Sequence, residues 1–306
     1  MASNLIMRAT YHYRCLYAKY PIVRLRDFTK TVRLKYTADT LRSSFVWLML
    51  CGYNYQLSTR SNYGSTVDCN DSSEFADIRA LIDSNHHGYY NTSRQLWQDR
   101  VLRSIFRKSQ GSPGHILPWV IFTCGSMGSG KTFVRNWCEK NNLLIDWDQL
   151  VIVDSDYIKE TMPEWSGYVE RNPRNAGSLC HEESVYMQEI GHEYAMSRSL
   201  DVCIDGSLSD WQWNSKLFKR IRAKYPRYRI AIIAVHVDES IARRRCGQRF
   251  LSIGRDIPDR AFLRSLAAIS TSLEILGPLA DAVIHISNNV AGEDPVLLRS
   301  DMNVQG

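Results

Sequence analysis

The run GSMGSGKT, residues 125–132, holds the residues of this sequence whose spacing most clearly predicts chemistry. It matches the pattern G-x-x-x-x-G-K-S/T, in which glycines let several backbone N–H groups point at one phosphate at the start of a helix. The lysine then reaches the outer phosphates, and the threonine hydroxyl faces a magnesium ion. The alternative interpretation is a flexible surface loop. We expect a nucleotide-binding loop made of Gly125, Ser126, Gly128, Ser129, Gly130, Lys131 and Thr132.

Acidic residues follow two later apolar runs that have the length of buried strands. The run VIV leads into Asp154 and Asp156, and the run VCI leads into Asp205. Phosphoryl transfer to an alcohol needs a group that accepts the hydroxyl proton. We expect Asp156 to do this, because it begins the next helix and faces the crevice beyond the strand ends. Asp205 is expected to support magnesium, directly or through water, or to orient the substrate. For both Asp156 and Asp205 the alternative is a helix N-cap.

Arginines are dense in the segment ARRRCGQRFLSIGR, residues 242–255, which follows the apolar run IAIIAVHV. Guanidinium groups can stabilise the negative charge that spreads over a phosphoryl group during transfer. We expect Arg249 and Arg255 to act in this way from a lid. The other three arginines of the segment are expected on a helix surface, and a solvated basic helix is the alternative for all five. These three are Arg243, Arg244 and Arg245.

An acidic stripe runs along the segment HEESVYMQEIGHEYAMSRSL. Glu182, Glu189 and Glu193 share one face of a helix by their i, i+7 and i+11 spacing. Because such a stripe is usually a solvated face, we expect two of these three side chains to be solvated and to have no further role.

Alternating strands and helices are expected to position these residues. From Pro118 onward, short β-rich runs are separated by helical patterns; the runs are WVIF, QLVIVD, LDVCID, YRIAIIAVHV and DAVIHIS. This alternation predicts an α/β fold with a mostly parallel sheet and helices on both faces. In such sheets the ligand lies beyond the carboxyl ends of the strands, where the predicted loop and acids fall.

The composition is that of a folded protein. The chain has 306 residues, of which 44% are hydrophobic, enough for one large domain or two ordinary ones. Its eight cysteines show no C-x-x-C pair and no metal-ligand spacing, which favours buried thiols in a reducing compartment. No apolar run approaches the ~18 residues of a spanning helix, so we expect no transmembrane segment and a cytoplasmic protein.

Positive charge is concentrated in the first third of the sequence. Residues 1–110 carry 16 Lys and Arg against 8 Asp and Glu, whereas residues 111–306 carry 22 against 24. The basic and aromatic run from Tyr11 could suit nucleic acid, an anionic membrane surface or an organelle import signal, and a solvated appendage without a partner is the alternative. Residues 57–77 read as a linker. We therefore expect a basic N-terminal extension and linker over 1–77 and a catalytic domain over 78–306.

The sequence resembles the zeta toxins and their relatives, which are P-loop kinases of nucleotide-linked small molecules. Four blocks carry the resemblance over roughly residues 115–290: GSMGSGKT, VIVDSDYIKETMPEW, HEESVYMQEIGHEYAMSRSLDVCIDGSLSD and RFLSIGRDIP. The resemblance implies that Asp156 is the catalytic base and that a substrate-facing glutamate falls on Glu189, or on Glu183 if the gap differs. The other implied site residues are Lys159, Asp205, Arg249 and Arg255.

The resemblance also implies the reaction and its cofactors. The best-known members use ATP and Mg²⁺ to phosphorylate the 3′-hydroxyl of the aminosugar in UDP-N-acetylglucosamine, and a plant-pathogen effector of similar fold phosphorylates the adenosine ribose of NAD. An antitoxin-like inhibitor would be a partner, although no antitoxin-like segment is evident in this chain. The separation from Lys131 to Asp156 is longer than in the bacterial toxins, and the insert YVERNPRNAGSLC matches no motif.

These observations together predict an ATP-dependent kinase that acts on a sugar hydroxyl of a nucleotide-linked small molecule. One alternative is a nucleic-acid end kinase, in which the basic N-terminal extension would add affinity. Another is a nucleotide-gated binding module without turnover. The presence of Asp156 beside Lys131 and the arginines speaks against the binding module, because binding alone needs no base.

Overall fold

The computed structural model describes residues 53–66, 73–108, 117–253, 257–290 and 293–303. Residues from Asn54 onward form one compact unit. Arg255, and residues 1–52 and 67–72 of the predicted N-terminal extension and linker, lie outside the described residues. Within the described part, no helix is both long and apolar enough to cross a bilayer.

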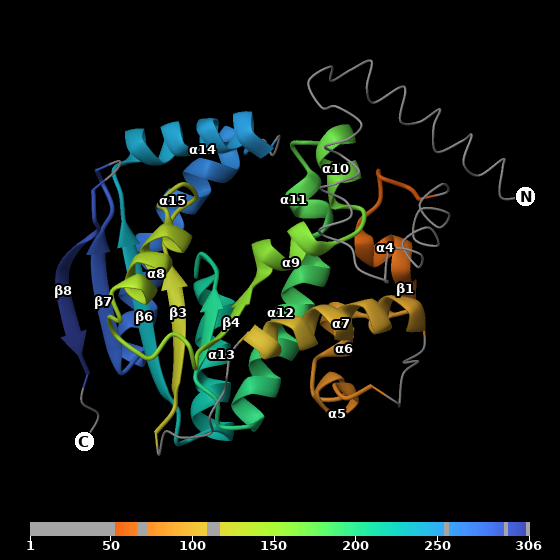
Figure 1. Ribbon diagram of the computed structural model, residues 1–306, viewed down its shortest axis with the longest axis horizontal. Helices are drawn as coiled ribbons and strands as arrows, with labels where there is room; N and C mark the ends of the chain where they lie inside the picture. The colour runs from red at the N-terminus through yellow and green to blue at the C-terminus, as the bar shows by residue number, and fades with distance from the viewer. Residues whose placement is uncertain (1–52, 67–72, 109–116, 254–256, 291–292, 304–306) are drawn as a thin grey trace, which may run out of the picture. The chain divides into compact units, whose positions relative to one another are not determined.

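A six-stranded sheet forms the centre of the unit, in the order β4-β5-β3-β6-β7-β8 (Figure 1). The strands are β3 (Trp119–Cys124), β4 (Val151–Asp154), β5 (Val202–Asp205), β6 (Arg229–His236), β7 (Ala282–Ser287) and β8 (Val296–Met302). Neighbouring strands are parallel except β8, which pairs antiparallel with β7 at the edge. The predicted mostly parallel α/β sheet is confirmed, and β8 is an addition that the apolar runs did not indicate.

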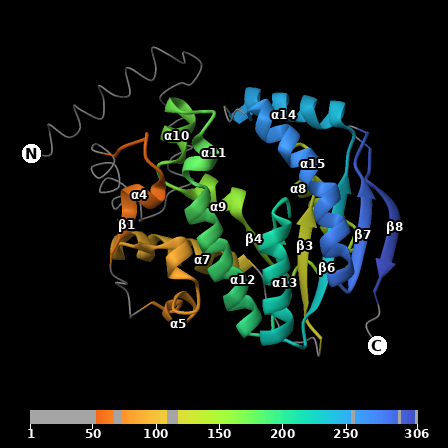
Figure 2. The same ribbon diagram turned by 180° about the vertical axis from the view of Figure 1, so that it is seen from behind.

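Helices cover both faces of this sheet (Figures 1 and 2). Ile121 packs with Val134 and Cys138 of α8 (Lys131–Lys140) on one face. The next residue, Phe122, points to the other face, where its ring lies 4.7 Å from that of Phe218 in α13 (Trp211–Lys224). Such alternation along a strand buries both of its faces. The remaining helices of this part are α9 (Ser155–Thr161), α10 (Trp165–Arg171), α11 (Ala176–Leu179), α12 (His181–Ser197), α14 (Glu239–Ile253), α15 (Asp259–Leu276) and η1 (Gly277–Leu279).

A helical front segment precedes the sheet and packs on α12. Its elements are α4 (Thr59–Tyr63), β1 (Gly64–Ser65), α5 (Ala76–Arg79), α6 (Ser84–His87), β2 (Tyr89–Tyr90) and α7 (Thr92–Lys108). Phe75 is fully buried, and the hydroxyl of Tyr168 donates to the carbonyl of Leu57 at 2.6 Å. The described residues between 57 and 77 therefore pack within the compact unit, where the sequence pattern predicted a linker.

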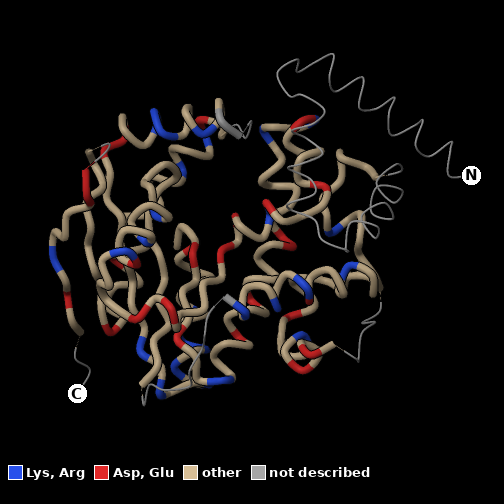
Figure 3. Tube along the Cα trace, in the orientation of Figure 1, with Lys and Arg blue, Asp and Glu red and all other residues tan. Residues whose placement is uncertain are grey.

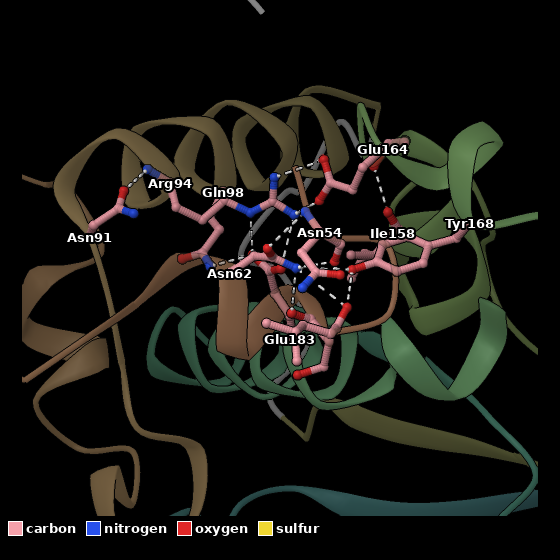
Figure 4. Close-up of polar contacts among 12 residues, drawn as sticks. Asn54, Asn62, Asn91, Arg94, Gln98, Ile158, Glu164, Tyr168 and Glu183 are labelled. Carbon is pink, nitrogen blue, oxygen red and sulfur yellow. Dashed lines mark hydrogen bonds and ion pairs between the residues drawn. The ribbon is translucent and has the colours of Figure 1, made fainter. Parts of the chain in front are cut away.

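A buried ion cluster fixes the front segment to the rest (Figure 4). The guanidinium of Arg94 in α7 donates to Glu183 of α12 at 2.6 Å and to Glu164, before α10, at 2.5 Å. The side chains of all three residues are at most 3% exposed. Gln98 also donates to Glu183, at 2.8 Å. Because buried charges are stable only when paired, α7 and α12 hold each other in one arrangement.

Candidate active site

Two glycines of the phosphate-binding loop adopt a backbone that other residues avoid. Gly128 has φ +77° and Gly130 has φ +82°, both in the left-handed region. A Cβ atom on Gly128 would lie 2.3 Å from the carbonyl oxygen of Ala242, and one on Gly130 would lie 2.3 Å from the amide nitrogen of Asn288. Glycine is therefore required at both positions by conformation and by space.

Hydrogen bonds hold the loop between strand β3 and helix α8. The side chain of Asn288 donates to the carbonyl of Ser129 at 2.8 Å, and the N–H of Met127 donates to the hydroxyl of Ser265 at 2.8 Å. Lys131 folds back and donates from Nζ to the carbonyl of Gly125 at 2.9 Å. Burial lowers the pKa of Lys131, while the carboxylates of Asp205 and Asp156 oppose this effect. The loop has the expected strand, loop and helix context.

The acid that ends β4 has a structural role. Asp154 is the N-cap of α9, because its Oδ1 accepts from the N–H groups of Asp156 at 2.8 Å and Tyr157 at 3.2 Å. The alternative of Asp156 as this cap is thus wrong. Burial raises the pKa of Asp154, as does the charge of Asp205, while the Tyr157 N–H and Arg135 lower it.

The acid that ends β5 is held on both oxygens. Asp205 is 5% exposed; its Oδ1 accepts from the hydroxyl of Thr123 at 2.6 Å, and its Oδ2 is ion-paired with Arg135 of α8. The same Arg135 nitrogen lies 3.5 Å from Oδ2 of Asp154. The alternative of Asp205 as a helix cap is wrong, because Asp210 caps α13 by accepting from Trp213 N–H at 2.9 Å.

Asp156 presents its carboxylate to the cavity. The side chain is 39% exposed, and Oδ1 lies 3.0 Å from Nζ of Lys159. Arg249, from α14, lies 3.7 Å from Oδ2. Asp156 is therefore set between two cations in the first turn of α9, with its backbone rather than its side chain used in the cap.

Helix α14 lies beside the loop and carries basic residues along its length (Figure 3). The side chain of Arg249 is 42% exposed and faces the acid of α9. Arg245 was expected on the helix surface, but it donates to the carbonyls of Asn288 at 2.9 Å and Ser129 at 3.4 Å. That part of the expectation is wrong, since Arg245 supports the phosphate-binding loop.

The acidic stripe of α12 is mostly buried. Glu189, 3% exposed, accepts from His87 at 2.8 Å and from Arg220 at 2.6 Å. Glu193, also 3% exposed, pairs with Lys224 and accepts from the Tyr225 hydroxyl. The prediction of a solvated face is thus wrong for Glu189 and Glu193. Of the three glutamates only Glu182 is exposed. Burial opposes ionisation of Glu189, but the bonds from His87 and Arg220 outweigh it and lower the pKa to about 2.

One cavity of about 1730 Å³ joins most of the predicted residues. Those that line it are Gly128, Gly130, Lys131, Thr132, Asp156, Lys159, Glu189, Asp205 and Arg249. Glu183, the alternative to Glu189, is fully buried against Arg94 instead. Sequence reasoning missed Arg135, which also lines the cavity; its position one helical turn after Lys131 was a usable signal.

The donor set for magnesium fits only in part. Thr132 lines the cavity at the start of α8, as the phosphate-binding loop requires. Oδ1 of Asp205 accepts from Thr123 and Oδ2 is ion-paired with Arg135, whose positive charge would repel a metal ion, so this acid does not fit a direct metal ligand. Among the described residues, no three His, Cys, Asp or Glu side chains gather as a metal site.

A phosphate-binding loop after the central strand of a parallel sheet, with acids at the neighbouring strand ends, defines a P-loop kinase-like protein. Residues 103–293 match the model of the Zeta toxin family, and the chain belongs to this family. No curated protein matches the chain.

Solved structures show the same fold at low identity. A structure from the PezAT chromosomal toxin–antitoxin system of Streptococcus pneumoniae aligns with TM-score 0.55 and 15% identity, covering 70% of this chain and 83% of that chain. The AvrRxo1-ORF1:-ORF2 complex aligns with TM-score 0.53 and 12% identity, over 82% and 80%. The complex of that pair with ATP aligns with TM-score 0.53 and 12% identity, over 80% and 76%.

Proposed function

We propose that this protein is a kinase that transfers the γ-phosphoryl group of ATP to a sugar hydroxyl of a nucleotide-linked small molecule. The observation that carries the proposal is that one cavity is lined by both the phosphate-binding loop and Asp156. Asp154, Asp156 and Asp205 all line the cavity, but Asp154 caps α9 and Asp205 is held by Thr123 and Arg135. The side chain of Asp156 is the most exposed of the three, at 39%.

Each residue has a role in this reaction. Lys131 binds the β- and γ-phosphates over the loop amides, and Asp156 accepts the proton of the acceptor hydroxyl as the oxygen attacks. Arg249, with Arg255 from outside the described residues, stabilises the charge of the transferring group. Lys159 holds Asp156 in place from 3.0 Å and Glu189 accepts a hydrogen bond from the acceptor.

Magnesium, when bound, neutralises charge on the phosphates. Thr132 would hold the ion together with the phosphates, and Asp205 would act on it only through water. The similarity to a structure from a toxin–antitoxin system also supports an inhibitory protein partner for this chain.

Radiolabelled ATP and an acceptor panel test the proposal. The panel holds UDP-N-acetylglucosamine, NAD, free nucleosides and an oligonucleotide with a 5′-hydroxyl. Label on a nucleotide-linked compound, lost in Asp156→Asn, is the expected result. If ATP binds but no member of the panel is labelled, a binding module without turnover takes its place.

A nucleic-acid end kinase is the second candidate. The observation in its favour is the charge of residues 1–60, which hold 10 Lys and Arg against 2 Asp and Glu. Label on the oligonucleotide alone would select this candidate. Deleting residues 1–52 should then weaken oligonucleotide binding most at low salt, because phosphate contacts are salt-dependent.

A further inference from the structure

The cavity extends beyond the phosphate-binding loop to a second end. We define this distal end by six lining residues: Arg60, His86, His87, Glu189, Trp213 and Asn214. The first three come from α4 and α6, which precede the family match that begins at residue 103. The front segment thus adds a wall that the matched family region does not contain. The total of about 1730 Å³ exceeds the roughly 300–1000 Å³ of a typical small-molecule site, so a second ligand group has room beside ATP.

Aromatic rings form one side of the distal end. The imidazole of His86 stacks on the indole of Trp213, with ring centroids 5.1 Å apart and planes 23° apart. His87 meets His86 edge-on at 4.7 Å. Because exposed ring faces in a cavity attract other planar rings, this wall suits a flat heteroaromatic group.

Hydrogen bonds to its backbone hold α6, the helix that carries His86 and His87, in place. Helix α6 ends at His87; its C-cap Gly88 turns the backbone with φ +67° and donates its N–H to the carbonyl of Ser84 at 2.8 Å. Arg60 donates to the carbonyl of His86 at 3.0 Å from the neighbouring helix. The wall is therefore preorganised, which reduces the entropy lost on binding.

Polar atoms beside the rings have hydrogen-bonding capacity left. Each oxygen of Glu189 receives one donor, from His87 and Arg220, whereas a carboxylate can accept about four in all. His192 lines the same cavity at 4% exposure, and its ring interacts with the charge of Glu189. A ligand with N–H groups would use the capacity that remains on Glu189.

We propose that the distal end binds the base of the nucleotide-linked acceptor, with its ring against Trp213 and His86 and an N–H donated to Glu189. This rests on the proposed function, and it assigns acceptor selection to the front segment. The sugar hydroxyl then lies between the distal end and Asp156, which lines the same cavity nearer the loop.

Binding measurements without turnover test the subsite. Calorimetry is run on the whole chain saturated with a non-hydrolysable ATP analogue and Mg²⁺, using UMP, CMP, GMP and nicotinamide mononucleotide as probes and ribose 5-phosphate as the base-free control. Trp213→Ala should weaken the binding of the tightest-binding mononucleotide about 5- to 150-fold, since one base–aromatic stack contributes about that factor to affinity. The affinity for ribose 5-phosphate should change less than twofold.

Matched variants separate stacking from folding. Trp211 stands two residues earlier on α13 and does not line the cavity, so Trp211→Ala should leave both kinds of probe unchanged. His86 is exposed, and His86→Ala should weaken binding of the same mononucleotide that Trp213→Ala affects. The subsite would be overturned if the wild-type protein bound every mononucleotide no more tightly than ribose 5-phosphate. Equal losses of mononucleotide affinity in Trp211→Ala and Trp213→Ala would also overturn it.

The two proposals fail in different ways. Base-dependent binding that Trp213→Ala removes, without phosphorylation of any panel acceptor, would keep the subsite and reject the kinase proposal. Phosphorylation of UDP-N-acetylglucosamine or NAD with the same acceptor KM in wild type and Trp213→Ala would keep the kinase and reject the subsite.

Discussion

Replacing Arg135 by Met should convert the acid pair at the strand ends into a divalent-cation site. Asp154 and Asp205 are paired in register on β4 and β5, and their two Oδ2 atoms converge on one nitrogen of Arg135. The Arg135 side chain is 12% exposed, so its loss leaves two largely buried carboxylates without the cation that they share. We expect a cost of about 3–5 kcal/mol, or a fall in Tm of roughly 6–20 °C for a unit of this size.

A divalent ion should restore part of this stability in the variant alone. At 100 times its Kd, a ligand that binds only the folded state adds about 2.7 kcal/mol, which raises Tm by roughly 5–10 °C. Thermal unfolding with and without 10 mM Mg²⁺ or Mn²⁺, in the absence of nucleotide, measures the effect. Arg135→Lys keeps a cation and should not respond, and Asp205→Asn in the Arg135→Met background should abolish the response. The reasoning would be refuted if neither ion raised the Tm of Arg135→Met, or if the ions raised the Tm of the wild-type protein equally.

Three further changes test other parts of the site. Asp156→Asn should slow single-turnover transfer about 10²- to 10⁴-fold with ATP affinity unchanged, because only the proton acceptor is lost; a larger loss in Asp154→Asn, which keeps the N-cap, would move the base to Asp154. Arg94→Gln should lower the urea-measured free energy of unfolding by about 3–5 kcal/mol, because it strands two buried carboxylates. Glu164→Gln should cost less, since burial and the charge of Glu183 already raise the pKa of Glu164 and a balanced pair remains; equal losses would contradict this. Burial lowers the pKa of His192 to about 4, although the charges of Glu189 and Glu193 oppose this effect. Between pH 6.5 and 4.5, His192 therefore becomes protonated in the unfolded chain but stays largely neutral in the folded chain. Stability should therefore fall on acidification by roughly 2–3 kcal/mol more in wild type than in His192→Leu, and parallel pH profiles would count against this.

Local patterns in the sequence were enough for the centre of the fold. The phosphate-binding loop is contiguous, so its glycines, lysine and helix could be predicted together, and strands β3 to β7 are apolar because both faces are buried. Strand β8 was missed because every one of its residues is exposed, and no burial pattern marks it.

The rest of the site depends on partners that are distant in sequence. Glu189 is buried because His87 and Arg220 lie beside it, and helical periodicity on α12 holds no information about either residue. The sequence favoured Asp156 over Asp154 as the acid that faces the crevice, but it left the N-cap to Asp156 as the alternative. That Asp154 is the cap follows only from the turn into α9.

The Arg94 cluster also limits how this protein can change through evolution. Its cation lies in α7 before the family match at residue 103, and its two carboxylates lie within the match. A lineage that exchanged or lost the front segment would bury two negative charges with nothing opposite them, unless both glutamates changed at the same time. Descendants of this chain should therefore inherit the front segment and the matched region together, as one heritable block.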